Sequence, residues 1–204
     1  VELSSLVAKE LANSKTVGWF QGRMEFGPRA LGGRSILADP RSEKMQKELN
    51  LKIKFRESFR PFAPSILEEQ SKNWFNLDCK SPYMLIVSDV KTNKLVKVKS
   101  NLNTLSKINQ IRSIVPSITH VDNSARIQTV SKEENPNYHQ LINKFKEMTG
   151  CPIVFNTSFN LGGQPLVETL HDAIFTLTNS KLEYLYMPEL GKLIKVPNVE
   201  EENE

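Results

Sequence analysis

Cysteine is scarce in this sequence, with only Cys79 and Cys151 among 204 residues. No CxxC pair or closely spaced Cys/His set is present, which argues against a structural zinc site. The count alone leaves one disulfide open. Two thiols in a chain of this length are nevertheless more typical of a reduced protein than of a disulfide scaffold, so we expect a cytoplasmic location.

Long apolar runs are also missing. No segment approaches the roughly 20 apolar residues needed to cross a bilayer, and the N-terminus lacks the layout of a signal peptide, so no membrane partner is expected. The chain begins at Val1 rather than Met, which indicates a piece of a longer polypeptide. Its length fits one compact domain with a sizeable core.

The motifs of several common active sites are absent as well. The sequence has no GxSxG elbow, no HExxH and no Cys–His nucleophile arrangement, and its glycine-rich stretch is neither a Walker A loop nor a GxGxxG fingerprint. The remaining polar inventory is rich in anion binders and poor in nucleophiles. That balance favours electrostatic stabilisation and positioning, as in phosphoryl or nucleotidyl transfer.

What is present is a local excess of positive charge. Lys and Arg number 27 against 23 Asp and Glu, for a net charge of +4. Residues 23–60 contain ten Lys/Arg and five Asp/Glu, an excess of +5, and they hold six of the eight arginines: Arg23, Arg29, Arg34, Arg41, Arg56 and Arg60. Four glutamates at the C-terminal end offset part of this charge. The clustering of guanidinium groups is therefore more informative than the total.

Hydrophobic periodicity and turn residues predict alternating helices and strands, which indicates an α/β or α+β sheet domain. Loops are expected over 21–40, 91–112 and 156–163. Extended, packed chain is expected over 54–65. The predicted helices lie at 3–12, 42–49 (with Ser42 as N-cap), 68–75, 138–149 and 167–178, and the predicted strands at 16–20, 82–90, 119–130 (two strands around a turn), 152–155 and within 184–196.

The first stretch that can carry chemistry is residues 22–35, GRMEFGPRALGGRS. Its four glycines let the backbone approach a ligand closely. Its three guanidinium groups suit two-pronged contacts with phosphate or carboxylate. The alternative interpretation is a long surface loop with solvated arginines.

The second stretch is residues 54–64, in which Lys54, Arg56 and Arg60 are separated by aromatic residues. If the segment is extended, Lys54 and Arg56 project from one face and Phe55 from the other. A pair of cations backed by apolar packing would then form an anion clamp. The alternative is an edge strand with solvent-facing basic residues.

The third stretch is residues 156–160, NTSFN, directly after an apolar strand. Ligands of open α/β sheets bind beyond the carboxyl ends of strands. Ser158 and Asn160 offer a hydroxyl and an amide at that place. The alternative is a turn whose polar side chains bond to their own backbone.

The fourth stretch is residues 120–126, HVDNSAR. A lone histidine at a strand start is most often a hydrogen-bonded structural residue. His120 and Asp122 would share a strand face, but nothing supplies a third metal ligand. Arg126 is the better functional candidate because it is the only arginine after residue 112.

Together these four stretches resemble the C-terminal domain of the NodU/CmcH-type O-carbamoyltransferases. The matching segments, in order from Gly22 to about Ile174, are GRMEFGPRALGGRSILADPR, KFRESFRPFAPSIL, HVDNSARIQTV and CPIVFNTSFNLGGQPLVETLHDAI. The resemblance implies a YrdC-like fold of the α/β (α+β) class, a twisted open sheet with flanking helices. We assign residues 1–196 to this domain and expect residues 197–204 to be a disordered acidic tail.

The resemblance also implies a reaction. The family domain binds ATP and carbamoyl phosphate, hydrolyses the latter to carbamate, and joins carbamate to the α-phosphate of ATP to give carbamoyladenylate and pyrophosphate. Any Mg²⁺ would be held through the nucleotide phosphates. A separate N-terminal domain of actin-like ATPase fold, with its own metal site, then passes the carbamoyl group to a hydroxyl, and 204 residues leave no room for it.

Site residues follow from the family's Lys-x-Arg and Ser-x-Asn signatures. They correspond here to Lys54 with Arg56 and to Ser158 with Asn160. The resemblance further indicates arginine ligands for the phosphate or carbamoyl group. We assign catalytic roles to Lys54, Arg60 and Arg126, ligand binding to Arg29, Lys54, Arg56, Ser158 and Asn160, and no metal ligand.

Two alternatives remain open. The first is an RNA-binding module, since residues 91–112 carry six basic residues and no acidic ones, and RNA binding needs a spread of phosphate contacts. The second is a domain that binds nucleotide without turnover. Because the arginines gather in a few loops rich in glycine and proline, a compact polyanion is favoured over nucleic acid.

Overall fold

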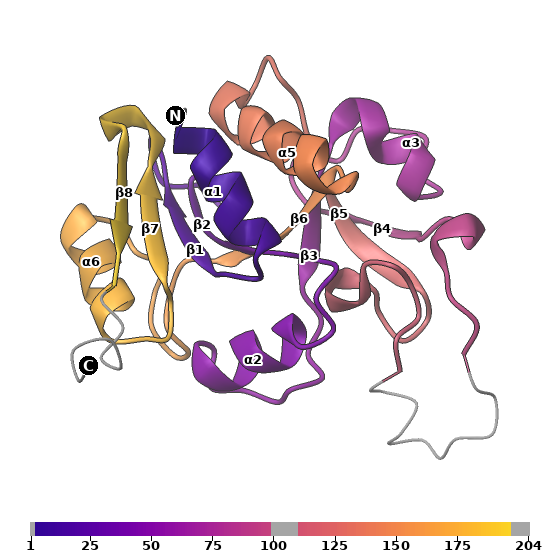
Figure 1. Cartoon of the computed structure of the whole chain (residues 1–204), viewed down its shortest axis with the longest axis horizontal. Helices are drawn as coiled ribbons and strands as arrows, with labels where there is room; N and C mark the ends of the chain where they lie inside the picture. The colour runs from indigo at the N-terminus through magenta and orange to yellow at the C-terminus, as the bar shows by residue number, and fades with distance from the viewer. Residues whose placement is uncertain (1–2, 99–109, 197–204) are drawn as a thin grey trace.

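A computed structural model describes residues 3–98 and 110–196, which are organised around one eight-stranded sheet (Figure 1). The helices are α1 Leu3–Ala12, α2 Met45–Lys52, α3 Ser71–Trp74, α5 Pro136–Thr149 and α6 Leu170–Thr178. The strands are β1 Val17–Phe20, β2 Arg34–Ala38, β3 Ala63–Leu67, β4 Ile86–Asp89, β5 Ser124–Val130, β6 Ile153–Ser158, β7 Tyr184–Met187 and β8 Lys192–Lys195. Short 3₁₀ turns lie at Glu68–Gln70, Thr92–Lys94, Pro116–Ile118 and Pro188–Leu190.

The strand order is β4-β5-β3-β6-β2-β1-β7-β8. Pairing is antiparallel except between β1 and β7 and between β3 and β5. The central strands β3 and β2 are buried along their whole length. The expected fold class, an open mixed α/β sheet with flanking helices, is confirmed.

Helices α1 and α5 pack against each other and lie in front of the sheet in Figure 1. Beneath α5, the buried Trp19 packs against Tyr138 at a centroid distance of 5.6 Å, and its indole nitrogen donates to the carbonyl of Gly32 at 2.7 Å. Its neighbour Gly18 is required by packing, because a Cβ there would lie 2.6 Å from the ring of Phe159. These contacts hold the glycine-rich loop over the sheet.

Several predicted elements are confirmed. The helix at 3–12 is α1, and the helix at 138–149 is α5, which ends at Gly150 in the left-handed conformation (φ 74°). The segment at 68–75 contains the short turn Glu68–Gln70 followed by α3. Amphipathic periodicity and a C-terminal glycine are local signals, so they identify helices without tertiary information.

Other predicted boundaries are wrong because sheet pairing extends or shortens the local patterns. The expected loop over 21–40 contains β2, and the first three residues of the expected loop over 156–163 belong to β6. The two strands pair with each other, with Ser35 opposite Ser158. The expected core strand over 82–90 is only the edge strand β4, with alternate residues exposed. The expected pair of strands over 119–130 is the single strand β5 after a tight turn.

Helix starts were also displaced. Helix α2 begins at Met45, with Lys44 rather than Ser42 at its N-cap and no capping side chain. Helix α6 begins after Thr169, whose hydroxyl and backbone exchange hydrogen bonds with Asp172 in a capping box. The Thr-x-x-Asp spacing is a local signal that would have located this start.

Three further expectations meet the structure here. Cys79 is exposed, Cys151 is buried, and neither forms a disulfide. Over the residues described, no helix is long and apolar enough to cross a membrane. Residues 99–109 of the lysine-rich segment and the acidic tail at 197–204 lie outside the described residues.

Candidate anion-binding site

The candidate site lies where β6 ends and its neighbours begin. Strands β2 and β3 run antiparallel to β6, and β5 runs parallel to β3, so the last residues of β6 meet the first residues of the other three. A cavity of about 150 Å³ opens at this edge. It is lined by Pro28, Arg29, Ala30, Arg56, Pro61, Phe62, Ala63, Met84, Arg126, Asn156, Thr157 and Ser158, none of which carries a carboxylate. We call it the arginine pocket.

Three arginines from three separate stretches line the arginine pocket. Arg29 and Arg126 lie close enough that their charges repel, and burial together with Arg29 lowers the pKa of Arg126. The Nε atoms of both are buried and have no hydrogen-bond partner among residues 3–98 and 110–196. Buried donors of this kind are normally satisfied, so the pair is suited to an anionic ligand that accepts several hydrogen bonds.

Arg56 is held more firmly than the other two. Its Nε donates to Asn50 Oδ1 at 2.6 Å, and its guanidinium lies 4.8 Å from the ring centroid of Phe62. Burial, then the nearby charge of Arg60, lowers its pKa. These contacts fix the guanidinium in the pocket wall while leaving its NH1 and NH2 groups as donors for an anion.

Lys54 sits behind Ser158 rather than in the pocket wall. Its ammonium donates to the carbonyl and hydroxyl oxygens of Ser158 at 2.6 and 3.2 Å, and to the carbonyl and amide oxygens of Asn160 at 3.0 and 2.7 Å. The side chain is buried, and no carboxylate of the described residues pairs with it. Burial, with a contribution from Arg56, lowers its pKa to about 7.

The predicted extended geometry of residues 54–65 is confirmed only at the end of the stretch, where β3 begins at Ala63, and is wrong around Lys54 and Arg56. Phe55 adopts φ 48°, and the backbone N–H groups of Lys54 and Arg56 bond to carbonyls of α2 and not to a neighbouring strand. The turn sends Lys54 toward Ser158 and Arg56 toward Phe62, so the two cations reach the site by different routes. Close packing against Gly162 supports the turn, because a Cβ there would lie 2.1 Å from the carbonyl oxygen of Lys54.

Not all the predicted residues line the arginine pocket. Arg60 is exposed, with NH1 3.8 Å from the Glu57 carboxylate, and it lies outside the pocket wall. Asn160 contributes by holding Lys54 and by accepting a hydrogen bond from Ser158 Oγ at 2.7 Å. The structure therefore brings together Arg29, Arg56, Arg126 and Ser158, with Lys54 and Asn160 directly behind.

His120 and Asp122 lie in a turn rather than on a shared strand face. Asp122 accepts from the backbone N–H and hydroxyl of Ser124 at 3.0 and 2.7 Å, and these bonds lower its pKa. Burial lowers the pKa of His120 despite the nearby carboxylate. Both residues line a second cavity of about 750 Å³ that shares Pro61 with the arginine pocket.

Glu25 is a site residue that sequence reasoning missed. Its Oε1 accepts from the backbone N–H groups of Leu31, Gly33 and Arg34 at 2.7, 2.6 and 3.2 Å. These bonds close the arch of residues 25–31 that carries Arg29. They also use N–H groups that the glycine-rich stretch would otherwise offer to a ligand. The single acidic residue in GRMEFGPRALGGRS was the available signal.

Arg34 in the same stretch has a structural role. Its NH1 donates to the carbonyls of Gln21 and Gly33, its NH2 to that of Glu168, and its guanidinium stacks 3.6 Å from the centroid of Phe20. These NH1 and NH2 contacts tie the loop to the chain before α6, while Nε is buried with no hydrogen-bond partner among the described residues.

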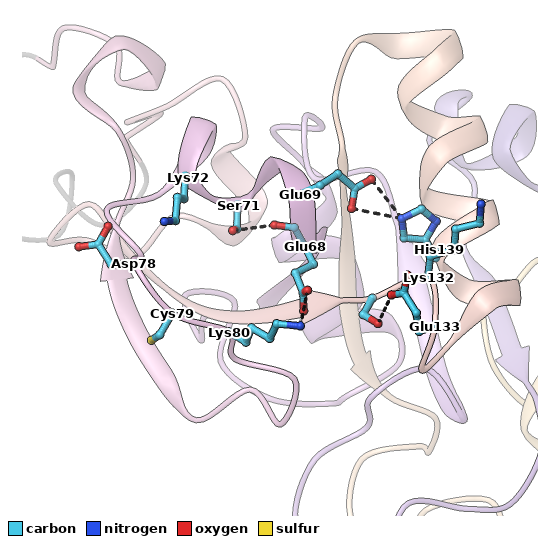
Figure 2. Close-up of a pocket in the computed structure, with 11 residues that line it drawn as sticks. Glu68, Glu69, Ser71, Lys72, Asp78, Cys79, Lys80, Lys132, Glu133 and His139 are labelled. Atoms are coloured by element: carbon cyan, nitrogen blue, oxygen red, sulfur yellow. Dashed lines mark hydrogen bonds and ion pairs between the residues drawn. The ribbon is translucent and has the colours of Figure 1, made fainter.

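A larger cavity on another part of the molecule differs from the arginine pocket in the charges of its lining. It measures about 650 Å³ and lies between the 68–80 segment, residues 131–133 and α5. Figure 2 shows that it holds charges of both signs, with Glu68 paired to Lys80 at 2.8 Å and Glu69 to His139 at 3.1 Å. Glu133 accepts a hydrogen bond from the hydroxyl of Ser131 at 3.0 Å. We call it the mixed-charge cavity. Across the described residues, no group of three or more His, Cys, Asp or Glu side chains is arranged to hold a metal ion.

Comparisons with known proteins place the chain in a family. A family model described as "Carbamoyltransferase C-terminus" matches residues 8–192. The chain is 53% identical over 189 residues to an uncharacterized protein of Synechocystis sp., covering 91% of the chain and 31% of that protein. It is 43% identical over 187 residues to nodulation protein NolO of Bradyrhizobium diazoefficiens, covering 90% and 31%. The chain thus spans about a third of the length of these curated relatives.

A solved structure shares the fold. Full-length HypF, crystallised in a phosphate- and nucleotide-bound form, matches 88% of this chain with 20% of its own, at a TM-score of 0.53 and 14% identity. That likeness concerns the fold alone, whereas the family match covers most of the chain. On that match, the chain belongs to the carbamoyltransferase C-terminus family.

Proposed function

We propose that this chain is the adenylate-forming domain of an ATP-dependent O-carbamoyltransferase. It binds ATP and carbamoyl phosphate and forms carbamoyladenylate, and a further domain of actin-like fold in the longer protein passes the carbamoyl group to a hydroxyl. Family membership supports the transferase class. The observation that carries the adenylate-forming role is the set of cations at the end of β6, buried Lys54 and half-buried Arg29, Arg56 and Arg126, which lacks a carboxylate partner among the described residues.

The charge of the site matches the charge of the ligands. ATP and carbamoyl phosphate are polyanions, and desolvated guanidinium groups bind phosphate oxygens strongly because the local dielectric is low. Arg29 and Arg126 repel each other in the unliganded site, and a phosphate between them relieves that repulsion. Ser158 offers a hydroxyl at the same edge.

The size of the arginine pocket limits what enters it. At about 150 Å³ it is smaller than the ~300–1,000 Å³ typical of pockets for larger organic ligands. It therefore takes the phosphate and carbamoyl groups. The adjoining cavity of about 750 Å³, reached past Pro61, has room for the nucleoside.

The residues of the site assist two reaction steps. Water first cleaves carbamoyl phosphate to carbamate and phosphate. A carbamate oxygen then forms a bond to the α-phosphorus of ATP, and the bond from that phosphorus to the bridging oxygen of pyrophosphate breaks. Arg29, Arg56 and Arg126 hold and neutralise the anions, and Lys54 offsets charge from behind Ser158. Mg²⁺ carried on the nucleotide phosphates would supply additional positive charge.

Calorimetry tests the proposal directly. The chain is titrated with ATP and Mg²⁺ and then with a non-hydrolysable carbamoyladenylate analogue. Arg126→Ala removes a guanidinium that lines the pocket, so we expect about a 100-fold loss of analogue affinity. Lys54→Ala removes the charge behind Ser158 and is expected to weaken binding to a similar degree.

Lys80→Ala is the matched control, since Lys80 is a lysine that already pairs with a carboxylate far from the pocket. Circular dichroism checks that each variant is folded. Equal affinities in wild type and all variants, or no binding in wild type, would overturn the site. Salt-dependent RNA binding that nucleotide does not affect would instead favour an RNA-binding module.

A further inference from the structure

Asn156 occupies an unusual position in the wall of the arginine pocket. Its side chain is only 1% exposed, on β6, two residues before Ser158. The amide nitrogen donates to the carbonyl of Ala30 at 3.0 Å, to Ser65 Oγ at 3.0 Å and to Gln128 Oε1 at 2.9 Å. Its Oδ1 is buried and has no hydrogen-bond partner within the described residues.

The neighbours of Asn156 determine which way its amide faces. Gln128 Nε2 donates to the carbonyl of Leu31 at 2.8 Å, so Gln128 must present its oxygen to Asn156. Ser65 donates its hydroxyl proton to that same oxygen at 2.6 Å. A reversed Asn156 amide would place oxygen against the Ala30 carbonyl and against Gln128 Oε1. The nitrogen therefore faces the network, and Oδ1 is left as an acceptor.

The buried acceptor of Asn156 contrasts with the charged groups of the pocket. Arg29, Arg56 and Arg126 are donors only, and they call for an anion. A bare phosphate would satisfy the arginines but offers Asn156 no proton when fully ionised. A ligand that satisfies both must combine an anionic group with an N–H donor.

We propose that Asn156 is a specificity-determining residue that accepts a hydrogen bond from the NH₂ group of carbamoyl phosphate. This inference rests on the proposed function and adds the group that distinguishes carbamoyl phosphate from acyl phosphates of the same shape and charge. An acyl phosphate with a methyl group in place of NH₂ leaves Oδ1 buried and unpaired. Unpaired buried acceptors are costly, so such ligands are rejected.

A pair of stable phosphonates tests the assignment. Phosphonoacetamide and 2-oxopropylphosphonate differ only in NH₂ against CH₃, and inorganic phosphate reports the arginines alone. We expect wild-type chain to bind phosphonoacetamide about 10-fold more tightly than its methyl counterpart. In Asn156→Ala the ratio should fall to about one. Ser65→Ala, which removes a network partner but keeps Oδ1, should retain the preference.

A second measurement needs no variant and so stays informative if Asn156→Ala is unfolded. In NMR spectra of ¹⁵N-labelled phosphonoacetamide with wild-type chain, one of the two amide protons should move downfield and exchange slowly with water. Equal binding of the two phosphonates by wild type, or a preference that survives in folded Asn156→Ala, would overturn the role of Asn156 while leaving the anion site intact. If wild type bound none of the three ligands, the proposed function itself would be overturned.

Discussion

The arginine pocket and the mixed-charge cavity of Figure 2 contain similar side chains in opposite arrangements. The mixed-charge cavity is about four times larger, at about 650 Å³ against about 150 Å³. Its lining mixes lysines with carboxylates, and two of its cationic side chains face glutamates, Lys80 with Glu68 and His139 with Glu69. In the arginine pocket the cations face one another or neutral oxygens.

This difference shows that charge compensation, and not size, marks the candidate site. An exposed ion pair is largely self-sufficient and gains little from a ligand. A buried cation without a counter-ion is unfavourable in the free protein, and an arriving anion removes that cost. Binding free energy is therefore available in the smaller cavity and largely absent from the larger one.

Replacing Lys54 should affect binding most. Lys54→Met keeps an unbranched side chain of similar length and removes the buried charge, so ATP affinity should fall by about 100-fold. Lys80→Met removes a lysine charge from the mixed-charge cavity and should leave affinity within about 2-fold. Isothermal calorimetry measures both. An effect of Lys80→Met as large as that of Lys54→Met would abolish the distinction between the two regions.

The affinity of the arginine pocket for anions should also depend on pH through Lys54, with a smaller effect than replacing that lysine. Lys54 has a pKa of about 7 in the free fold, against an ordinary value of 10.5, and a bound anion raises it again. Binding above pH 7 must then take up a proton, so affinity should fall by up to about tenfold per pH unit above 7. Calorimetry in buffers of different ionisation enthalpy measures the uptake, and no uptake at pH 8 would contradict the expectation.

The titration of Lys54 should also make folding stability depend on pH, but stability should rise with pH where ligand affinity falls. Between pH 7 and 10.5 the unfolded chain keeps the Lys54 proton that the free folded chain has lost. The unfolded state binds more protons in this window, so the stability of unliganded wild type should rise with pH relative to Lys54→Met. Urea titrations of both proteins at pH 7 and 9 provide the comparison.

Glu25→Gln should have a moderate effect. The glutamine keeps an oxygen for the N–H groups of Leu31, Gly33 and Arg34 but loses the negative charge that strengthens those bonds. A looser arch places Arg29 less well, and affinity for phosphate-containing ligands should fall by about 5-fold. Calorimetry with inorganic phosphate and ATP would measure it. Unchanged affinity would show that the arch is held by other contacts.

The smallest effect is expected at the mixed-charge cavity. Glu69→Gln breaks the pair with His139, in which the histidine side chain is mostly buried but the Glu69 carboxylate is 52% exposed and screened by solvent. Such pairs contribute little, so the thermal midpoint should move by no more than about 2 °C and ATP affinity should not change. Differential scanning calorimetry and ligand titration test both. A loss of ATP affinity here would reveal a coupling between the two regions that their separate linings do not suggest.

Local patterns in the sequence anticipated part of this architecture. Helix α5 carries its apolar periodicity and its terminal Gly150 in adjacent residues, and both were found. The segment of β2 was missed, because its place in the sheet depends on β1 and β6, which lie before and far after it in the chain. The sequence pattern likewise predicts a loop at Asn156, which lies in β6. Its partners Ala30, Ser65 and Gln128 come from three other parts of the sequence.

The sequence by itself determined which segments carry the cations and that the chain lacks nucleophilic and metal-binding motifs. It also carried the family likeness that covers most of the chain. Only the tertiary structure decided that Arg29, Arg56 and Arg126 meet and that Arg60 stays outside. It also decided that Lys54 is buried with no carboxylate partner in the part of the chain that the structure describes. The physical reason is that the electrostatic energy of these cations depends on the distances between them and on their burial. Both are set by strand pairing between segments far apart in the sequence.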